Sequence, residues 1–470
     1  MTMCQANTWR AAMAAVVVTV CGCATYNSPF VHKSEDELDE MERLDEIAAR
    51  HFASGDYIAA DRTLLALTAE PTVSRPLYEL ERVSVLLQKD CKKEARELML
   101  KVARDFELLF DERSEEEAVS LWHGENEKVF KGDAHERATL YAFLALSFLE
   151  TGEWDDAERS VKNGLLADSA NTEEAKYNSD YALLKYLGYV ACSKAGRTSD
   201  ADSYLRDLRG TLGDDNPAVD ILTKSPLPNA FAVVWAGTPP SYVRGGEYSH
   251  VRHVVPGRGS PFSYLTAGVG DGVELLIPTG LADVNFQAST RGGREMDTVL
   301  KDKAAVKTGM AASGNILIAA GFACFSAMGS DGRADIVLGS VGGGCILLGC
   351  TFHIVGACIN SQADVRSWKN LPGELLVVPM VLPGGDQKIS VRGYLRRDNV
   401  VCTSKDVSIT PSSVATAHLS LLRYPTVTNP ATAIVNVGVE ASKAAEAPIS
   451  AALPAEITPM PIANGEGGSK

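Results

Sequence analysis

The sequence lacks the short motifs that most often mark an enzyme, and it is poor in positive charge. No G-x-S-x-G or Walker motif occurs in the 470 residues, and His135-Glu136 lacks the second histidine of a zinc-protease helix. Lys and Arg number 45 against 60 Asp and Glu, so the net charge is −15. Such a balance makes nucleic acid an unfavourable electrostatic partner. We therefore expect neither catalytic residues nor a nucleic-acid partner.

A cysteine framework is also missing. Seven cysteines follow Cys23, and an odd number cannot all pair within one chain. Four of the seven fall in one apolar stretch, where cysteine behaves as a small hydrophobic residue. Their spacings do not match the paired C-x-x-C ligands of zinc sites. The sequence thus predicts no disulfide scaffold, no metal site and no cofactor.

The first residues have the layout of a signal peptide that ends at a lipid-modified cysteine. Arg10 precedes the apolar run Ala11 to Val20, which is too short to span a bilayer. Small residues then lead to Cys23, a pattern that resembles the bacterial lipobox. We expect residues 1–22 to be a lipoprotein signal peptide and 23–34 a tether that is acylated, with palmitate or similar chains, at Cys23. Ala24 in place of an aspartate favours the outer membrane, with the protein facing the periplasm.

Glycine and proline are rare between residues 35 and 220, and apolar residues recur there at helical spacing. A motif repeats in this region: a glycine at a turn, usually an aromatic two residues on, and a small residue five on. The residues concerned are Gly55, Tyr57 and Ala60; Gly152, Trp154 and Ala157; and Gly196 and Ala201. A degenerate unit centres on Asp90 and Ala95. This layout predicts a helical domain with tetratricopeptide-like (TPR-like) repeats, which usually bind a protein or peptide on a concave surface. The alternative is a packed helical domain in which no groove is used.

Residues 309–363 contain two long apolar segments on either side of the polar turn Asp331–Asp335. They predict a helical hairpin. Glycine recurs every seven residues, which returns to nearly the same helix face, so the glycines form a stripe that lets two helices pack closely. The stripe consists of Gly314, Gly321, Gly342, Gly349 and Gly356.

Two interpretations of this hairpin remain open. Each segment is long enough to span a membrane. However, basic residues flank both ends of the hairpin and leave a lone arginine in the turn, so an exported chain would insert against the positive-inside bias. The hairpin is therefore either buried under its own chain or inserted in a membrane after export, in which case homo-oligomers are one outcome.

The remaining regions, 229–308 and 364–423, predict a small β-rich domain, and the Ala/Pro-rich tail 424–470 is expected to be disordered. We expect strands at Ala230–Trp235, Val273–Ile277, Glu374–Leu382 and Lys388–Leu395. The turn Pro383–Asp386 should join the last two as a hairpin, and the strands before and after the apolar segment should share one small sheet. The predicted fold class is α+β.

Three stretches carry a resemblance to a known family. They are Phe130-Lys131-Gly132 with His135-Glu136-Arg137; Tyr177 to Gly188; and Ser361 to Trp368 followed by Leu371-Pro372. In these stretches the chain resembles a family of uncharacterised bacterial lipoproteins with tetratricopeptide-like repeats. In that family, too, the tryptophan string follows an apolar helical pair. The resemblance implies location and architecture, and it brings no catalytic residues.

The string itself also has a physical interpretation. Asp364 and Arg366 could pair and fix the angle at which the chain leaves the hairpin, while Ser367 and Trp368 follow at the entry to a strand. Trp368 suits an interface, with its ring inward and its N–H outward. We favour structural support over a binding site for these residues.

Together these features predict a membrane-anchored, non-catalytic scaffold in the cell envelope that binds a protein or peptide partner. The alternative is an oligomeric membrane-inserting or secretion-related assembly built from the hairpins.

Overall fold

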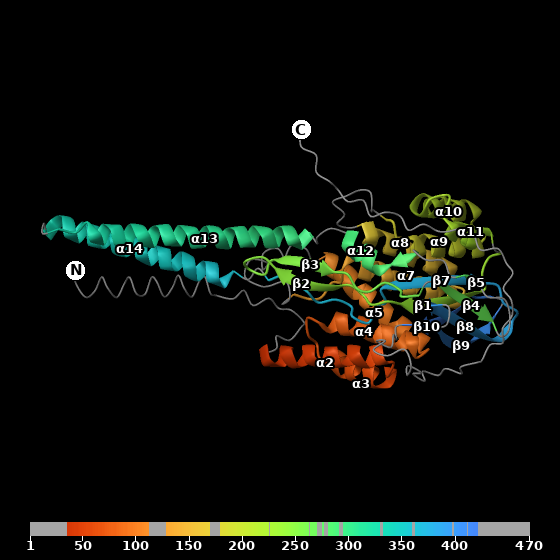
Figure 1. Cartoon of the computed structure of the whole chain (residues 1–470). Helices are drawn as coiled ribbons and strands as arrows, with labels where there is room; N and C mark the ends of the chain where they lie inside the picture. The colour runs from red at the N-terminus through yellow and green to blue at the C-terminus, as the bar shows by residue number, and fades with distance from the viewer. Residues whose placement is uncertain are drawn as a thin grey trace. The chain divides into compact units, whose positions relative to one another are not determined.

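The computed structural model describes residues 35–111, 128–169, 179–224, 226–262, 264–269, 275–276, 281–290, 295–329, 332–359, 362–396, 399–410 and 412–421. The predicted signal peptide, Cys23, the tether and the tail 424–470 lie outside these residues. The chain is α+β, as predicted: helices fill the N-terminal part, and several small sheets follow (Figure 1).

The helices before the first sheet are arranged in successive pairs, each joined by a short turn. The pairs are α2 (Glu35–Ser54) with α3 (Tyr57–Ala69), α4 (Arg75–Gln88) with α5 (Lys92–Asp111), α7 (Ala134–Thr151) with α8 (Trp154–Ser169), and α9 (Ala182–Lys194) with α10 (Thr198–Leu212). The short helix α11 (Pro217–Lys224) ends this region.

The same turn geometry closes all of these pairs. One residue in each turn has a positive φ: 73° at Gly55, 64° at Asp90, 74° at Gly152 and 75° at Gly196. The next residue donates its N–H to the carbonyl five positions earlier, for example Asp56 to His51 and Glu153 to Phe148. This is the hydrogen bonding of a Schellman cap, which glycine favours because it has no Cβ to strain.

The small residue five positions after each turn is buried. Ala60, Ala95 and Ala157 are fully buried, and Ala201 is nearly so. The two aromatic residues of the motif, Tyr57 and Trp154, pack partly buried against the same hydrophobic core. Close approach of the second helix of each pair therefore depends on alanine at these positions.

Two four-stranded sheets and a two-stranded ribbon follow the helices. The first sheet has the order β10-β1-β7-β6, the ribbon pairs β2 with β3, and the second sheet has the order β5-β4-β8-β9. The strands are β1 (Ala230–Ala236), β2 (Ser241–Gly245), β3 (Val251–Val255), β4 (Tyr264–Val269), β5 (Leu275–Leu276), β6 (Ala282–Asp283), β7 (Glu374–Met380), β8 (Gly385–Arg396), β9 (Asn399–Ile409) and β10 (Ala415–Ser420). A short helix, α12 (Val284–Thr290), follows β6.

The first sheet is the middle layer between the helices and the second sheet. Phe231, Val233 and Trp235 of β1 pack into the helical core, whereas Ala232 and Val234 face the second sheet. All seven residues of β1 are buried. Burial on both faces explains why this strand is a continuous apolar run rather than an alternating one.

The first helix of every pair contacts this middle layer or the chain that leads to it. The ring centres of Phe52 of α2 and Phe143 of α7 lie 6.3 Å and 5.2 Å from the ring centre of Trp235. Tyr186 of α9 lies 6.2 Å from Phe231, and Ser84 of α4 accepts a hydrogen bond from Trp368. The helices and the first sheet thus share one hydrophobic core, and the chain itself fills the inner face of the helical array.

Strand pairing differs from the sequence prediction in two respects. Strands from before and after the apolar segment do share sheets, but there are two such sheets. The hairpin predicted across Pro383–Asp386 is wrong, because β7 pairs with β1 and β6 whereas β8 pairs with β4 and β9. The turn carries the chain from the middle sheet to the outer one. Of the strand predicted at Val273–Ile277, the described part is β5 alone.

Candidate functional site

The apolar segment forms a pair of long helices, α13 (Glu295–Ser326) and α14 (Gly332–Cys358), which run side by side (Figure 1). Two stretches of 23 residues, Ala304–Ser326 and Asp335–Ala357, are long and apolar enough to cross a membrane. At about 1.5 Å per residue such a stretch matches a hydrocarbon layer of about 30 Å. Only 11% of the most apolar window in each stretch is buried. The described part of the chain therefore leaves most of this hairpin uncovered.

The glycine stripe lies at the contact between the two helices. A Cβ added to Gly314 would come within 2.9 Å of the Gly349 carbonyl oxygen, and one added to Gly349 would come within 2.7 Å of that of Gly314. Gly321 and Gly342 face each other in the same way: a Cβ added to Gly321 would lie 2.6 Å from the Gly342 carbonyl oxygen, and one added to Gly342 would lie 2.8 Å from that of Gly321. Gly356 is looser, since its nearest neighbour is the Met310 Cβ at 3.4 Å. The backbones approach so closely that a side chain fits at none of the first four positions without a shift.

The outer surface of the hairpin is apolar. Its exposed large side chains include Ile316, Phe322, Ile336, Val337, Val341 and Leu348. One polar pair crosses between the helices: His353 Nε2 lies 3.1 Å from Asn315 Oδ1. Removing a side chain such as Ile336, which is 69% exposed, from water is favourable by about 2 kcal/mol. A surface made of many such side chains calls for a large apolar cover.

The two ends of the hairpin meet at a root that also holds the β2–β3 ribbon. Lys307 of α13 donates to the Ile359 carbonyl oxygen at 3.2 Å, and its ammonium lies 5.0 Å from the centre of the Tyr248 ring. Ala363 donates its N–H to the Ser249 carbonyl oxygen at 2.9 Å. Arg244 donates back to the Ala363 carbonyl oxygen, also at 2.9 Å. The ribbon tip and the hairpin are therefore fixed to each other.

Residues 362–373, the root segment, carry the chain from α14 into β7 across the helical core. Asp364 and Arg366 form the predicted pair, with Nε and Oδ1 2.9 Å apart. Arg366 also donates to Ser74 Oγ at 3.0 Å and to the Lys128 carbonyl oxygen at 2.8 Å. One guanidinium thus joins the root segment to the start of α4 and to the chain before α7.

The next three residues of the root segment are held by buried acceptors. Glu136 Oε1 accepts the N–H of Trp368 at 2.6 Å, and the two oxygens of Glu81 accept those of Lys369 and Asn370 at 2.5 Å and 2.8 Å. Burial raises the pKa of Glu81 well above its ordinary value, and the neighbouring Asp45 carboxylate adds to the rise. Asp45 itself pairs with the Lys369 ammonium at 2.6 Å. This arrangement holds the backbone of the root segment in place.

The structure brings together two motifs that lie far apart in the sequence. Trp368 is buried, and its indole N–H, which was expected to point outward, donates to Ser84 Oγ at 2.9 Å. Ser367 is buried beside it. Arg366 lies 5.6 Å from the Phe130 ring, so the Phe130–Arg137 stretch and the tryptophan string form one contact. Sequence reasoning missed Asp45, Glu81 and Ser84.

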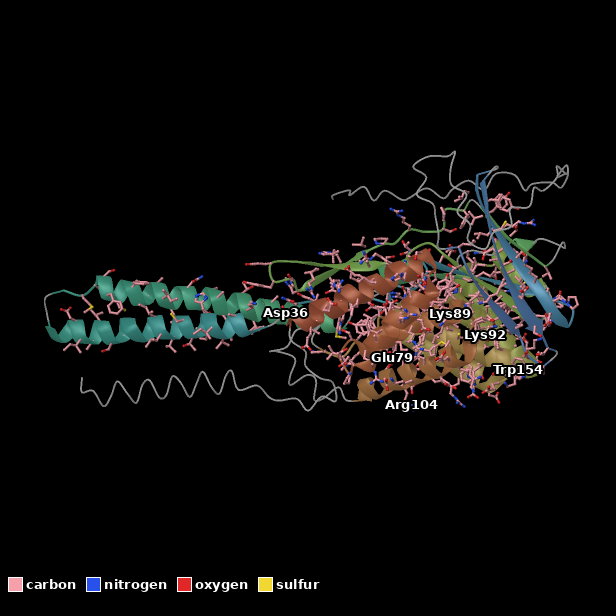
Figure 2. All side chains as sticks on the ribbon, turned by 90° about the horizontal axis from the view of Figure 1, so that it is seen from below. Asp36, Glu79, Lys89, Lys92, Arg104 and Trp154 are labelled. Carbon is pink, nitrogen blue, oxygen red and sulfur yellow. The ribbon has the colours of Figure 1, made fainter. Side chains whose placement is uncertain are left out.

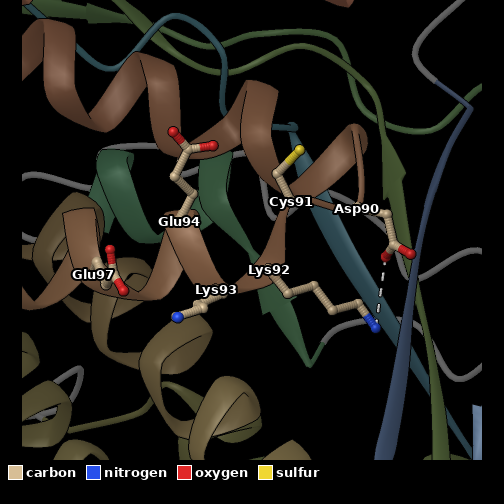
Figure 3. Close-up of a pocket in the computed structure, with 6 residues that line it drawn as sticks. All are labelled: Asp90, Cys91, Lys92, Lys93, Glu94 and Glu97. Carbon is tan, nitrogen blue, oxygen red and sulfur yellow. Dashed lines mark ion pairs between the residues drawn. The ribbon is translucent and has the colours of Figure 1, made fainter.

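A pocket at the start of α5 is lined by six residues, Asp90, Cys91, Lys92, Lys93, Glu94 and Glu97 (Figure 3). Its main cation is already engaged: Lys92 pairs with Asp90 at 3.6 Å and with Glu150 at 2.6 Å. Lys92 also donates to the Thr416 carbonyl oxygen of β10. The pocket thus lies beside a seam between α5 and β10.

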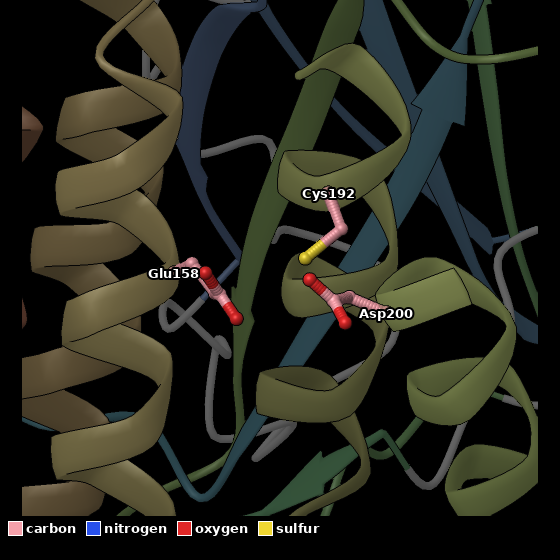
Figure 4. A group of neighbouring side chains, drawn as sticks. All are labelled: Glu158, Cys192 and Asp200. Atoms are coloured by element: carbon pink, nitrogen blue, oxygen red, sulfur yellow. The ribbon is translucent and has the colours of Figure 1, made fainter. Parts of the chain in front are cut away.

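Glu158, Cys192 and Asp200 lie close enough to share a metal ion, with ligand atoms within 4.8 Å of one another (Figure 4). Arg197, however, already forms ion pairs with the two carboxylates of this group. It pairs with Glu158 at 2.5 Å and with Asp200 at 3.9 Å, and Lys162 also pairs with Glu158. Burial, reinforced by Glu158, raises the pKa of the Cys192 thiol to about 11. Because Arg197 and Lys162 already engage the Glu158 carboxylate, we interpret the group as an ion-pair network that joins α8 to α10.

Among the described residues, the uncovered apolar surface of the hairpin and the contacts at its root are the features that most strongly suggest a function. Comparison of the chain with protein-family models, with curated proteins and with solved structures finds no match.

Proposed function

We propose that this protein is a lipid-anchored envelope protein whose apolar hairpin inserts in a bilayer and holds a non-catalytic helix-and-sheet body at the membrane. The observation that carries the proposal is the hairpin: two adjacent helices of membrane-spanning length, about a tenth buried, with an apolar outer surface. Insertion replaces the missing cover with lipid. Of the two interpretations of the hairpin, low burial supports insertion over burial within the chain.

The lipid on Cys23 would serve as the second anchor in this proposal. Helix α2 begins at Glu35, and twelve residues of chain span at most about 40 Å, so the lipid and α2 stay close. Asp45 of α2 pairs with Lys369 of the root segment, and Asp36, labelled in Figure 2, lies in the first turn of the same helix. Both anchors would then reach one membrane, which we propose to be the outer membrane seen from the periplasm.

The helix pairs support a tetratricopeptide-like assignment, which we also propose. Their turns share one hydrogen-bond pattern, and an alanine is buried at the same position in each. The surface that such repeats usually offer to a peptide is filled here by β1 and the root segment. An envelope protein bound by this scaffold would therefore meet the outer helices, where Ile58, Leu65 and Leu166 are exposed.

A second candidate is an oligomer built from inserted hairpins. The observation in its favour is that Gly343 and Gly344 of α14 have nothing within 4 Å of the position of a Cβ. Small residues on the lipid-facing side allow another helix to approach closely. Sizing of the full chain in detergent separates the two candidates, because a discrete ring-sized species supports the oligomer and a monomer supports the scaffold.

Thiol labelling tests insertion directly. Cys350 is exposed on the hairpin, so a membrane-impermeant maleimide reaches it quickly unless lipid covers it. We expect slow labelling of a single-cysteine variant that retains Cys350 once the protein is reconstituted in vesicles. Lys388→Cys, on the exposed side of β8, provides a control that should react at once. Equal rates at the two positions in vesicle-bound protein would contradict the proposal.

A further inference from the structure

The root of the hairpin carries a group of cationic and aromatic side chains at the level where the apolar stretch begins. The stretch starts at Ala304, and Lys307 lies one helical turn further on. Tyr248 of the ribbon tip lies beneath the Lys307 ammonium, and Arg244 on β2 reaches the chain just after α14. We call Arg244, Tyr248 and Lys307 the root belt. Three separate segments contribute to it, and the contacts at Ile359 and Ala363 hold them together.

The sign of charge here is opposite to that of the chain. The whole protein carries −15, yet two of the three belt residues are cations and none is acidic. Glu247 is the acidic residue of the ribbon tip. Cationic side chains beside an apolar surface favour an anionic partner there.

We propose that the root belt binds the phosphate groups of anionic phospholipids in the leaflet that the hairpin enters. This inference rests on the proposed insertion and names the lipid class that the root recognises. Lysine and arginine stems lie along apolar surface while their charged ends reach phosphate, and tyrosine is typical of the same interfacial depth. Lys307 donates one of its three N–H groups to the Ile359 carbonyl oxygen, and Arg244 donates its Nε–H to the Ala363 carbonyl oxygen. Each side chain therefore retains donors for phosphate.

This lipid class also accounts for the direction of insertion. The positive-inside bias acts on segments that cross during synthesis. A hairpin that enters after export keeps its basic root on the side of entry, where anionic headgroups hold it in place. The root belt would therefore limit how deeply the hairpin descends and would fix the body against the leaflet surface.

The test is flotation of the full-length chain with Cys23→Ser, so that acyl chains do not dominate binding. It is mixed with phosphatidylcholine vesicles, or with the same vesicles containing phosphatidylglycerol. We expect tighter partitioning onto the anionic vesicles, and we expect Arg244→Gln with Lys307→Gln to lose about fivefold of this partitioning for each charge removed. The matched control is Arg206→Gln with Lys388→Gln, exposed cations on α10 and β8, elements away from the root (Figure 1).

The outcomes separate the two proposals. If the protein binds neutral and anionic vesicles equally, or if the control pair loses as much as the belt pair, the root belt is overturned while insertion stands. Failure to bind either vesicle overturns insertion as well. Loss of the anionic preference at high salt, with binding to neutral vesicles retained, supports the belt, because salt screens exposed charges and leaves apolar insertion in place.

Discussion

The Glu136 carboxylate has two structural roles. It closes a capping box at the start of α7, where Oε2 accepts the N–H of Asp133 at 2.6 Å. Its other oxygen accepts the N–H of Trp368 from the root segment. The side chain is 1% exposed, so neither donor has water as a substitute. The cap of one helix and the attachment of the hairpin therefore depend on the same group.

The first prediction concerns this group. Glu136→Ala leaves two buried N–H groups unpaired, and we expect it to lower the free energy of unfolding by about 3 kcal/mol. Denaturant titration of the full chain in detergent measures the change. Glu97→Ala, an exposed carboxylate on α5, should change stability little and serves as the control. Similar losses in the two variants would contradict the role given to Glu136.

His418 gives a prediction on pH. It is buried on β10, where its Nδ1 accepts the Trp235 indole N–H at 3.2 Å. Burial, with the nearby Lys405 and Lys92 ammonium groups, lowers its pKa well below the ordinary value. A group with a depressed pKa in the folded state stabilises the fold above the unfolded pKa and ceases to do so as pH falls.

We therefore expect the protein to lose about 1.4 kcal/mol of stability per pH unit through this histidine, beginning near pH 6.5 and continuing down to its folded pKa. Buried acids such as Glu81, whose pKa is raised, change stability in the opposite direction over part of this range. The measurement is the difference in unfolding free energy between wild type and His418→Gln from pH 7 to 5. A difference that does not vary with pH would argue against a neutral buried His418.

The candidate site could be predicted from the sequence only on one side of each contact. Asp364, Arg366 and Trp368 were recognisable because charged and aromatic residues follow an apolar run. Their acceptors were not. Glu81 lies on α4 among consecutive buried residues, and a carboxylate there needs a partner. That partner is the backbone of Lys369 and Asn370, and backbone N–H groups leave no signature in a sequence.

At the scale of elements, the turns between helices were predictable because their requirement is local. A left-handed residue followed by a cap is specified by a few neighbouring positions, and Asp90 satisfies it without glycine. Strand partners are not local. β7 and β8 are separated by a short turn with tight-turn residues, yet they lie in different sheets because both faces of β7 are buried. An apolar sequence indicates that a strand is buried, but it does not indicate which strand pairs with it.

The hairpin provides a prediction with a matched control on one helix. Gly342→Leu places a side chain where a Cβ already lies 2.8 Å from the Gly321 carbonyl oxygen, so the helices must separate. Gly344→Leu, two residues away, meets nothing within 4 Å and should stabilise the helix slightly. Spin labels at Ser313 and Ser340 report the distance between the two helices by electron paramagnetic resonance. A longer or broader distance with Gly342→Leu alone is expected, and identical distributions in both variants would rule out the packed stripe.

At the scale of the molecule, the two proposed anchors can be tested with a set of four proteins. Lys307 and Ile359 lie in hydrogen-bond contact, so a short Gly/Ser linker can replace residues 308–358 without separating the flanking chain. We expect wild type, Cys23→Ser and the hairpin deletion all to remain with membranes on fractionation. Combining the substitution with the deletion should release the protein. Release by Cys23→Ser alone would show that the hairpin is no anchor.

The sequence divides this molecule at residues 220 and 364, but the hydrophobic core crosses both positions. Composition changes where helices give way to strands, and such changes suggest domain boundaries. Phe231 and Trp235 nevertheless pack among α2, α7 and α9, and Trp368 lies beside Phe143. A contact between residues more than two hundred positions apart depends on shape, which composition does not encode.

The pairing of β1 also constrains the order in which the protein can fold. Ala230 pairs with Met380 on one side and with Ala415 on the other, so the middle sheet cannot close until nearly all the described chain has emerged. Sequence-distant pairing of this kind is slow. Residues 309–358 are synthesised before either partner strand, and they are therefore present, apolar and uncovered, while the body is still unfolded. If the hairpin inserts as we propose, it can meet lipid during that interval, and the body would then complete its fold on a membrane that the hairpin has already entered.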